Sequence, residues 1–445
     1  MKVVLTSAWF PPDTIGGTEN YVQALATGLQ SVGVEVLVMA PQQSGSADQY
    51  TYDGIRVRRY PDPTAAGVGD GEARRGQPDV FAALLRTEAP DVYHQHSLTP
   101  ACGLEHLAIA RALGASTITT LHLPDVVCMR GTMMRFGAEP CDGRIIVQRC
   151  GACWLHSKGL PRTVAKVAAT ILQVSGASSG GRTKGRLGTA CRAPELAHER
   201  VASVHNMAEL SDRIVAVSAW LFASLLANGV QREKLRCVRQ SVSCETIQSQ
   251  PRRRHERTSL RVGFFGRATW VKGLDTLLSA MRHIPAQQRI EIFMHLVGDA
   301  AEDASYRRRV LSLAERDSRV HILAPVAPGS VRRAMRDYDI VAVPSRWLET
   351  GPLVAMEAVS AGVPVLGSDL GGIAELVEPG VTGWLLPPDR PREWAAKLES
   401  LANGEVANLR PESRRVKLVS HLELAEQMAT LYAEVVSSKR NLVGS

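Results

Sequence analysis

The sequence lacks any run of 18 or more apolar residues, although a helix that crosses a membrane needs about 20 of them. It therefore predicts no membrane-spanning helix. The opening MKVVLTSAWF, followed by Pro11 and Pro12, is typical of a strand rather than of a secretory leader. We therefore expect a cytoplasmic protein, in which the eight cysteines do not form disulfides. Four of them are scattered and are expected to fill cores, namely Cys102, Cys191, Cys237 and Cys244.

Acidic residues are absent from Gly143 to Pro194, while nine basic residues in that stretch exceed the net charge of +8 of the whole chain. Such a field attracts phosphate on nucleic acid, on anionic lipid or on a phosphorylated substrate, and a solvated loop is the plainer alternative. Nucleic-acid binding predicts interleaved aromatics, but the stretch holds only Trp154. We expect no nucleic acid, and we expect peripheral contact with an anionic membrane such as the inner face of the plasma membrane.

A complete G-x-G-x-x-G motif is missing as well, which disfavours a simple NAD site. The first half alternates short apolar runs with helical patterns, and this alternation is typical of a parallel sheet covered on both faces. The expected strands are Val3–Thr6, Val34–Ala40, Ile55–Tyr60, Val92–Gln95, Thr117–Leu121 and Ile214–Val217. The expected helices are Glu19–Ser31 and Gly103–Ala112.

The strand–loop–helix pattern restarts after the polar, arginine-rich linker Gln248–Ser259. The expected elements are strand Leu260–Phe265, helix Leu274–Met281 and strands Ile290–Val297, Val320–Leu323, Ile340–Val343 and Pro364–Gly367. Two doubly wound, Rossmann-like α/β domains follow from this repetition. We place the first at residues 1–247, with an insertion at about 125–200, and the second at 260–419. The amphipathic Ser420–Val436 predicts a helix, within 420–445, that returns to the first domain.

The residues best suited to chemistry are Glu349-Thr-Gly-Pro-Leu-Val-Ala-Met-Glu357, which follow the strand Ile340–Val343. A helix is expected to begin near Gly351 or Pro352, since proline suits the first helical position. The amides of Gly351, Leu353 and Val354 would then face an anion such as phosphate. The carboxylates of Glu349 and Glu357 suit pairs of sugar hydroxyls, although Glu357 could equally be an ordinary helix residue.

The stretch from Ile340 to Leu386 resembles the carboxyl-terminal domain of the family 4 glycosyltransferases, which have the GT-B fold. The matching runs there are Val343-Pro344-Ser345, Glu349 to Glu357, Ala361-Gly362-Val363-Pro364-Val365, Gly371-Gly372-Ile373-Ala374-Glu375 and Gly380-Val381-Thr382-Gly383. Further matches are Gly266-Arg267, Lys272-Gly273, Leu296-Val297-Gly298-Asp299, Asp91 to His96, and Gly16-Gly17-Thr18-Glu19. The resemblance is weak from Asp125 to Val204. It implies two domains that face a central cleft.

The resemblance also implies roles for residues of the second domain. Arg267 and Lys272 would grip the donor diphosphate, where fixed cations offset the charge of the leaving group. Glu349 would lie against the donor sugar and Glu357 would hold the ribose. Gly298 would let the backbone pass close to the nucleotide, and the base would lie near Leu323–Val326. No cofactor is expected to be required for catalysis.

In the first domain the resemblance implies that His122, which ends the strand Thr117–Leu121, faces the donor sugar. A histidine at the carboxyl end of a strand projects into the crevice of an open sheet, although a lone histidine is more often a structural group. We interpret His94 and His96 as structural. Gly16 and Gly17 would form the glycine loop on the acceptor side.

The implied activity is that of a retaining, hexosyltransferase-like glycosyltransferase. It would move a sugar from a UDP- or GDP-sugar to a sugar, a lipid-linked acceptor or a small molecule, in polysaccharide, glycolipid or glycoconjugate synthesis. Two alternatives share the fold: a catalytically inactive homologue that binds a nucleotide sugar, and a nucleotide-sugar epimerase. Retention of Arg267, Lys272, Glu349 and Glu357 argues against the first, and the paired glutamates argue against the second.

Four clustered cysteines predict a structural site of another kind. Cys128, Cys141, Cys150 and Cys153 lie within 26 residues, and the last two form a Cys-Gly-Ala-Cys motif. Four thiolates at this spacing suit a structural zinc ion. Buried free thiols or an iron–sulfur cluster are the alternatives, because only one such motif is present.

Overall fold

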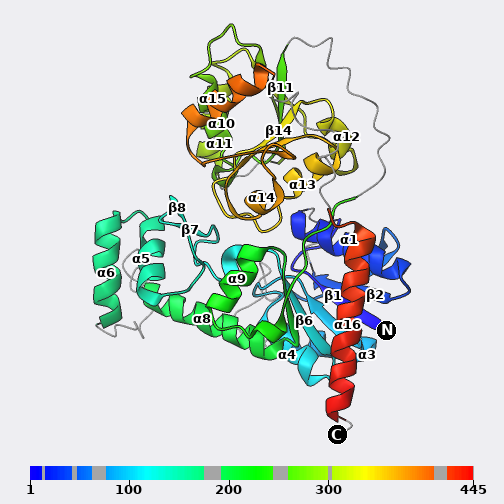
Figure 1. The fold of residues 1–445 in the computed structure, drawn as a ribbon. Helices are drawn as coiled ribbons and strands as arrows, with labels where there is room; N and C mark the ends of the chain where they lie inside the picture. The colour runs from blue at the N-terminus through cyan, green and yellow to red at the C-terminus, as the bar shows by residue number, and fades with distance from the viewer. Residues whose placement is uncertain are drawn as a thin grey trace. The chain divides into compact units, whose positions relative to one another are not determined.

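The computed structural model describes residues 1–445 except 13–15, 43–47, 63–76, 175–191, 244–258, 299–302, 405–417 and 444–445. It divides into two compact units, the first formed by Met1–Ser241 with Val419–Ser445 and the second by Val242–Leu418 (Figure 1). Most of the expected linker, together with Asp299, Cys191 and Cys244, lies outside the described residues. Within the described part of the chain, no helix is both long and apolar enough to span a bilayer.

The first unit is built on an eight-stranded sheet in the order β10-β9-β6-β5-β1-β2-β4-β3, in which only β3 runs antiparallel to its neighbour. The strands are β1 (Lys2–Thr6), β2 (Glu35–Pro41), β3 (Gln49–Tyr52), β4 (Ile55–Tyr60), β5 (Val92–Gln95), β6 (Ser116–Leu121), β9 (Arg213–Ala216) and β10 (Leu235–Cys237). Six lie within a residue or two of the expected ranges. The edge strands β3 and β10 were not expected, because short and partly exposed strands carry little apolar pattern.

The helices of the first unit cover this sheet and carry the insertion. They are α1 (Gly17–Ser31), α3 (Gln77–Glu88), α4 (Leu104–Ala112), α5 (Val147–Ser157), α6 (Arg162–Val174), α8 (Ala193–Leu210) and α9 (Ala219–Ala227). Within the insertion α5 packs between α6 and α8, and a small hairpin of β7 (Met134–Arg135) and β8 (Glu139–Pro140) lies ahead of them in the chain. The buried alanines Ala152, Ala165 and Ala169 allow α5 and α6 to approach closely.

The carboxyl-terminal helix α16 (His421–Val443) packs on α1 of the first unit (Figure 1). Leu424, Met428 and Tyr432 along α16 are fully buried in the same core as the strands of that sheet. The approach is close because a Cβ on Gly28 would come within 2.8 Å of the Ala425 side chain. The amphipathic pattern of the carboxyl-terminal segment is therefore explained by burial of one face of α16.

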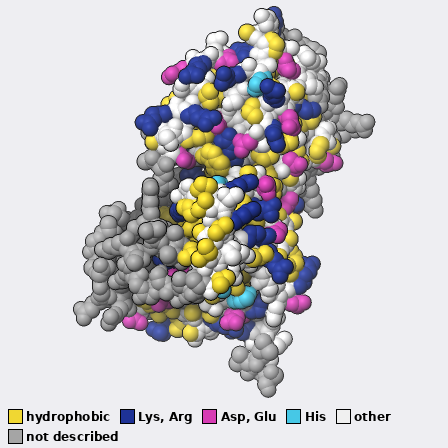
Figure 2. Space-filling model, turned by 90° about the vertical axis from the view of Figure 1, so that its left-hand side faces the viewer, with side chains coloured by type: hydrophobic (Ala, Val, Ile, Leu, Met, Phe, Trp, Pro, Cys, Tyr) yellow, Lys and Arg dark blue, Asp and Glu magenta, His cyan; other side chains and the backbone are white. Residues whose placement is uncertain are grey.

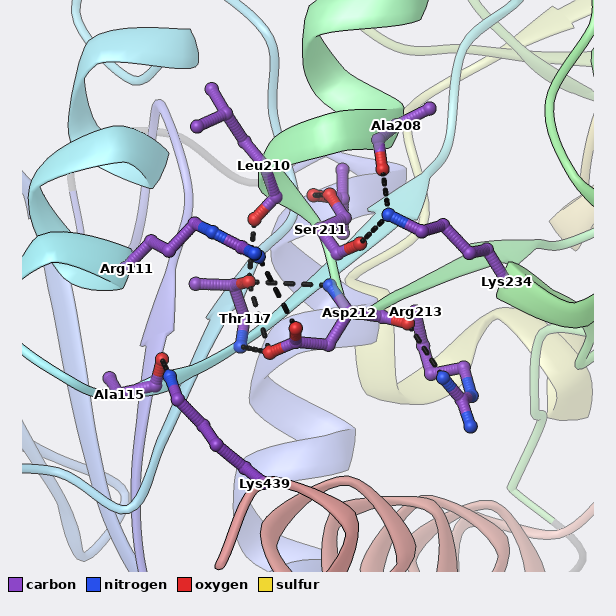
Figure 3. A network of polar contacts seen from close by, with 11 residues as sticks. Arg111, Ala115, Thr117, Ala208, Leu210, Ser211, Asp212, Arg213, Lys234 and Lys439 are labelled. Atoms are coloured by element: carbon purple, nitrogen blue, oxygen red, sulfur yellow. Dashed lines mark hydrogen bonds and ion pairs between the residues drawn. The ribbon is translucent and has the colours of Figure 1, made fainter. Parts of the chain in front are cut away.

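A polar network joins α16 to the amino ends of β6 and β9 (Figure 3). Asp212 accepts the backbone N–H of Thr117 at 2.8 Å, and the Thr117 hydroxyl donates to the Leu210 carbonyl at 2.6 Å. Lys439 of α16 donates to the carbonyl of Ala115 at 2.7 Å. These contacts lie at the amino ends of the strands, whereas the candidate residues lie at the carboxyl ends. We therefore infer that the contacts stabilise the fold and take no part in the candidate site.

The second unit holds a six-stranded, wholly parallel sheet in the order β13-β12-β11-β14-β15-β16. The strands are β11 (Leu260–Gly266), β12 (Ile290–Leu296), β13 (Val320–Leu323), β14 (Ile340–Val343), β15 (Val365–Ser368) and β16 (Gly383–Leu386). The helices are α10 (Leu274–Met281), α11 (Ala304–Ala314), α12 (Val331–Met335), α13 (Leu353–Ser360), α14 (Gly371–Leu376) and α15 (Pro391–Ala402). The strand order reverses between β11 and β14, and ligands bind open α/β sheets outside the strand ends at such a point.

Candidate functional site

The centre of the candidate site is an ion pair between Lys272 and Glu349. Lys272 ends the short 3₁₀ turn η4 (Trp270–Lys272) after β11, and Glu349 lies in the loop between β14 and α13. The Lys272 Nζ donates to Oε1 of Glu349 at 2.8 Å. Because β11 and β14 are neighbours at the reversal of strand order, both loops leave the same edge of the sheet. The topology thus joins two side chains that are 77 residues apart in the sequence.

Glu349 is only 5% exposed, and the Ser345 hydroxyl donates to the same carboxylate oxygen at 2.5 Å. Burial by itself raises the pKa of Glu349. The charge and hydrogen bond of Lys272, with the hydrogen bond from Ser345, outweigh burial and leave the pKa of Glu349 below its ordinary value. The carboxylate is therefore ionised and held in one orientation. The Lys272 side chain is 24% exposed, so part of it is open to solvent.

Arg346 fixes the loop that carries Glu349 to the loop that carries Lys272. Its guanidinium contacts Asp275 at 2.7 Å and the Thr276 hydroxyl at 3.0 Å, both in the first turn of α10, and it also contacts Asp389. The side chain is 9% exposed, and a buried, planar guanidinium that meets several acceptors has little freedom to move. The two loops therefore form one preorganised surface.

Glycines make these close approaches sterically feasible. Gly273 has φ +63°, and a Cβ there would lie 1.9 Å from the carbonyl oxygen of Pro344. On the other side of the Glu349 loop, the Gly372 N–H donates to the Glu349 carbonyl at 2.7 Å. A Cβ on Gly371, whose φ is +49°, would lie 2.8 Å from Cα of Leu348. Larger residues at these positions would displace the backbone that aims Glu349.

The helix α13 begins at Leu353, one or two residues later than expected, with Pro352 as its N-cap residue. The expectation that the Leu353 amide points toward a ligand is wrong, because this N–H donates to the carbonyl of Gly351 at 2.9 Å. The proline explains the shift, since its ring and the tight turn before it delay the first regular helical turn.

Glu357 lies half-buried on α13, and its protonation differs from that of Glu349. Burial raises its pKa to about 7, and the nearby positive charge of Arg332 opposes that rise. A carboxyl group in this environment exchanges its proton near neutrality, so a ligand that donates hydrogen bonds would favour the ionised form. The two glutamates of the motif therefore differ in charge state, because Glu349 contacts the ammonium group of Lys272 whereas burial dominates at Glu357.

The other expected donor-binding positions lie at the same edge of the sheet. Arg267, directly after β11, is exposed, and within the described residues its guanidinium has no hydrogen bond or ion pair. Gly298 follows β12 with φ +67°, and open space surrounds the position of a Cβ there. Val297 is 46% exposed and Leu323, at the end of β13, is 37% exposed. Arg267, Val297 and Leu323 thus lie at the carboxyl ends of β11, β12 and β13, three neighbouring strands on one side of the reversal of strand order.

The first unit carries a buried histidine cluster at the carboxyl ends of β5 and β6. His122 is 5% exposed; its Nε2 lies 3.1 Å from Nδ1 of His96, and its Nδ1 lies 3.3 Å from the Gln240 amide nitrogen. Burial lowers the pKa of His122 to about 3, so the ring is neutral. The Tyr21 ring packs against it at 4.6 Å. A sugar hydroxyl could use His122 only by replacing one of these internal partners.

His94 lies one layer deeper in this cluster. Its Nδ1 is 2.7 Å from the hydroxyl of Tyr432 on α16, and its Nε2 is 2.7 Å from the hydroxyl of Thr120. Both ring nitrogens are thus occupied within the unit, and burial holds the pKa of His94 well below its ordinary value. Neither Gln240 nor Tyr432 was predicted as a partner of these histidines, because neither lies in a recognisable motif.

The glycine loop of the first unit meets the start of α1. Gly16 is the N-cap residue and Gly17 is the first helical residue. A Cβ on Gly16 would lie 2.5 Å from a carboxylate oxygen of Glu19, which is 5% exposed. Burial raises the pKa of Glu19, while backbone hydrogen bonds of Glu19 and Gly16 lower it in part. Residue 16 must therefore be small for Glu19 to fold back over the helix start.

The four clustered cysteines line one pocket of the insertion, together with Arg130 and Arg149. The Cys153 sulfur accepts the backbone N–H of Phe136 at 3.2 Å, and Arg149 is paired with Asp142. As placed, no group of three or more His, Cys, Asp or Glu side chains in the described part of the chain is arranged to hold a metal ion. The fold thus brings the cysteines to one place, and the zinc site stays a prediction.

The two units and the charged strand-end site define an α/β protein suited to an anionic, nucleotide-like ligand. The family model described as Glycosyltransferase Family 4 matches residues 15–167, and the model described as Glycosyl transferases group 1 matches residues 247–417. The chain belongs to the family 4 glycosyltransferases. Neither model covers residues 168–246, which include the second half of the stretch from Asp125 to Val204 where the resemblance is weak.

Named relatives match over part of their length. The D-inositol 3-phosphate glycosyltransferase of Corynebacterium efficiens is 30% identical over 186 residues, which are 40% of this chain and 43% of that protein. The enzyme of the same name from Rhodococcus erythropolis is 35% identical over 145 residues, 32% of this chain and 33% of that protein. The matches thus span less than half of these relatives.

Solved structures match over nearly the whole chain. Sucrose-phosphate synthase from Thermosynechococcus elongatus has a TM-score of 0.62 at 18% identity, with 98% of this chain and 99% of that chain covered. Anabaena HepE in complex with UDP has a TM-score of 0.66 at 15% identity, with 98% of this chain and 100% of that chain covered. These likenesses establish the GT-B fold, as expected from the sequence.

Proposed function

We propose that this chain is a retaining, hexosyltransferase-like glycosyltransferase that transfers a sugar from a UDP-sugar to an acceptor hydroxyl. The observation that carries the proposal is the pair of Lys272 and Glu349 at the strand-order reversal of the second unit. The names of the relatives from Corynebacterium and Rhodococcus support sugar transfer, and the complexes of HepE with UDP and with UDP-glucose support a uridine donor.

The diphosphate of the donor would contact the cations of the site, and its base would contact the apolar side chains. The Lys272 ammonium and the exposed Arg267 guanidinium would neutralise the diphosphate, and their charge would count most as the leaving group develops. The base would rest on the exposed apolar side chains Val297 and Leu323. Gly298 would let the nucleotide approach the backbone without a clash from a Cβ.

Glu349 and Glu357 would bind hydroxyls of the donor. Glu349 is ionised, and Lys272 and Ser345 hold its carboxylate in one orientation, so it would accept hydrogen bonds from the sugar. Glu357, whose pKa is about 7, would become ionised when it accepts hydrogen bonds from the ribose. One motif would thus bind two sugars, through a carboxylate that is already ionised and a carboxyl group that ionises on binding.

In the proposed reaction the bond between the anomeric carbon and the diphosphate oxygen breaks. The acceptor oxygen attacks the same face of the sugar, so configuration is retained. The acceptor proton passes to the departing phosphate oxygen, and the nucleoside diphosphate leaves. Lys272 would stabilise the charge on that phosphate throughout, while Glu349 holds the sugar in place.

The first test is ligand binding, because a ligand that binds only the folded protein raises its unfolding temperature. We expect UDP and UDP-glucose to stabilise the wild-type protein, with Lys272→Ala losing the effect. GDP and GDP-mannose serve as the matched comparison. Equal stabilisation by both bases would contradict the uridine assignment, and stabilisation by neither would contradict donor binding altogether.

The second test separates an enzyme from an inactive homologue. We expect hydrolysis or transfer from a labelled donor by wild-type protein, and its loss in Glu349→Gln with donor binding retained. A protein that binds UDP-sugar but shows neither reaction with any acceptor class would support the inactive-homologue alternative.

The pocket lined by Cys128, Cys141, Cys150 and Cys153 is our proposed structural zinc site. Convergence of four thiols from a stretch of 26 residues supports it, since closed Cys₄ sites stabilise small insertions that have little core. The ion would require the side chains to turn toward a common point from their present rotamers.

A further inference from the structure

The helix α6 of the first unit exposes one apolar side to solvent. Val164, Val167, Ile171 and Val174 are between 50% and 82% exposed. Their spacing of three, four and three residues puts them in one stripe along the helix. The helix is already packed through another side, because Ala165 and Ala169 are buried in the core of the insertion.

Such an exposed apolar stripe is unusual on a helix whose other face is already packed in a core. Surface helices normally place polar residues away from the core, and contiguous exposed apolar side chains mark interaction surfaces. The stripe is entirely aliphatic and nearly as long as the helix itself. Figure 2 looks onto this side of the molecule and shows hydrophobic side chains gathered there, with Lys and Arg beside them.

The charge around α6 identifies the kind of partner. Lys158, Arg162 and Lys166 are exposed at the start of the helix and just before it. Arg162 and Lys166 lie over the Phe136 ring at 5.0 Å and 5.7 Å, so their long stems run along the protein surface. Glu139 of β8 offsets part of this charge by contacting Arg162 at 4.0 Å, but the stretch from Gly143 to Pro194 contains no acidic residue, so the surface around α6 stays basic.

We infer that α6 is a docking surface for an anionic lipid membrane. The aliphatic stripe would enter the boundary between headgroups and acyl chains, while the neighbouring Lys and Arg side chains contact lipid phosphates. Nucleic acid does not fit this face, since single strands stack on aromatic side chains and the stripe has none. The inference rests on α6 alone and is independent of the proposed function.

Vesicle flotation with the full chain tests the inference. We expect wild-type protein to float with phosphatidylcholine vesicles that contain phosphatidylglycerol, and to float far less with phosphatidylcholine alone or in high salt. Val167→Ser with Ile171→Ser should lower the partition at least about tenfold, because two aliphatic groups no longer leave water. Lys166→Gln should weaken binding to the anionic vesicles only.

Val80→Ser is the matched control. Val80 is a 42% exposed valine on α3 of the same unit, and its replacement should leave flotation unchanged. The single variant Val174→Ser changes a side chain that is 82% exposed, so it tests the stripe without risk to folding. UDP-induced stabilisation should persist in every variant, which separates this surface from the donor site.

Three results would overturn the inference. One is wild-type protein that stays with the soluble fraction in the presence of anionic vesicles. Another is a Val167→Ser, Ile171→Ser protein that floats like wild type. The third is sedimentation without lipid that reveals a dimer abolished by the same substitutions, since a second copy of the chain would then cover the stripe.

Discussion

Replacement of Lys272 by methionine tests the electrostatic arrangement of the site without reference to catalysis. Methionine keeps most of the apolar stem of lysine but removes the ammonium group, so the Glu349 carboxylate is left 5% exposed without its cation. Removing one partner of a buried pair costs about 3–5 kcal/mol. Because Ser345 still donates to the carboxylate, we expect the lower end of that range, about 3 kcal/mol.

For a domain of this size, a loss of about 3 kcal/mol lowers the unfolding temperature by roughly 6–12 °C. Thermal unfolding of the ligand-free protein, followed by near-UV circular dichroism, measures the shift. Adding Glu349→Gln to the Lys272→Met variant should restore much of the lost stability, because the neutral amide leaves no unpaired charge buried at this position. This recovery distinguishes an unpaired charge from simple loss of packing.

The pH dependence has a definite sign. In the wild type the pKa of Glu349 is lowered from 4.5, so its stabilising contribution is present at neutral pH and is lost as pH falls through the folded-state pKa. Without Lys272, burial dominates and raises the pKa of Glu349, so the variant loses stability as pH rises above about 4.5. The gap between wild type and variant should therefore widen from acidic to neutral pH. An unchanged unfolding temperature, or no recovery in the double variant, would refute the reasoning.

Three further predictions concern other parts of the molecule. Burial raises the pKa of Glu357 from 4.5 to about 7, so the free energy of unfolding of the wild type should fall as pH rises between those values. Glu357→Gln should remove that decline, as measured by thermal unfolding at a series of pH values. An equal decline in both proteins would contradict this. Gly371→Ala should weaken UDP-glucose binding at least about tenfold by calorimetry, because its Cβ meets the Leu348 backbone; Gly380→Ala, with φ +74° and open space around it, should bind like wild type. Elemental analysis should find about one zinc ion per chain, lost in Cys150→Ser, and a metal-free wild-type protein would leave the cysteines as plain thiols.

Much of the fold could be predicted from the chain alone. The strands Ile55–Tyr60, Val92–Gln95 and Ile340–Val343 occur as expected. Ile340–Val343 is an uninterrupted apolar run, which is typical of a buried parallel strand, whereas Ile55–Tyr60 begins by alternating apolar and polar residues. The restart at Leu260 indicated the second doubly wound sheet. Short edge strands such as Gln49–Tyr52 were not predicted, since half-exposed residues carry no comparable pattern.

In the candidate site, the motifs predicted which residues lie at the carboxyl ends of the strands, but they did not predict the contacts of each group. The positions of Lys272 and Glu349 after two strands indicated a common edge of the sheet, and the structure joins them at 2.8 Å. The orientation of the Leu353 amide was predicted wrongly, because a tight turn at Pro352 uses that N–H locally. The role of Arg346 in tying both loops together could not be foreseen, since its partners come from separate parts of the chain.

The order of apolar and polar residues by itself determined the strands, the helices, the two-domain organisation and the family of this protein, since these depend on local periodicity and short motifs. Only the tertiary structure decided the charge states of Glu349 and Glu357, the internal partners of His122 and the exposure of the α6 stripe. The physical reason is that pKa values and solvent exposure depend on what long-range packing brings near a side chain. Sequence neighbours do not specify that environment.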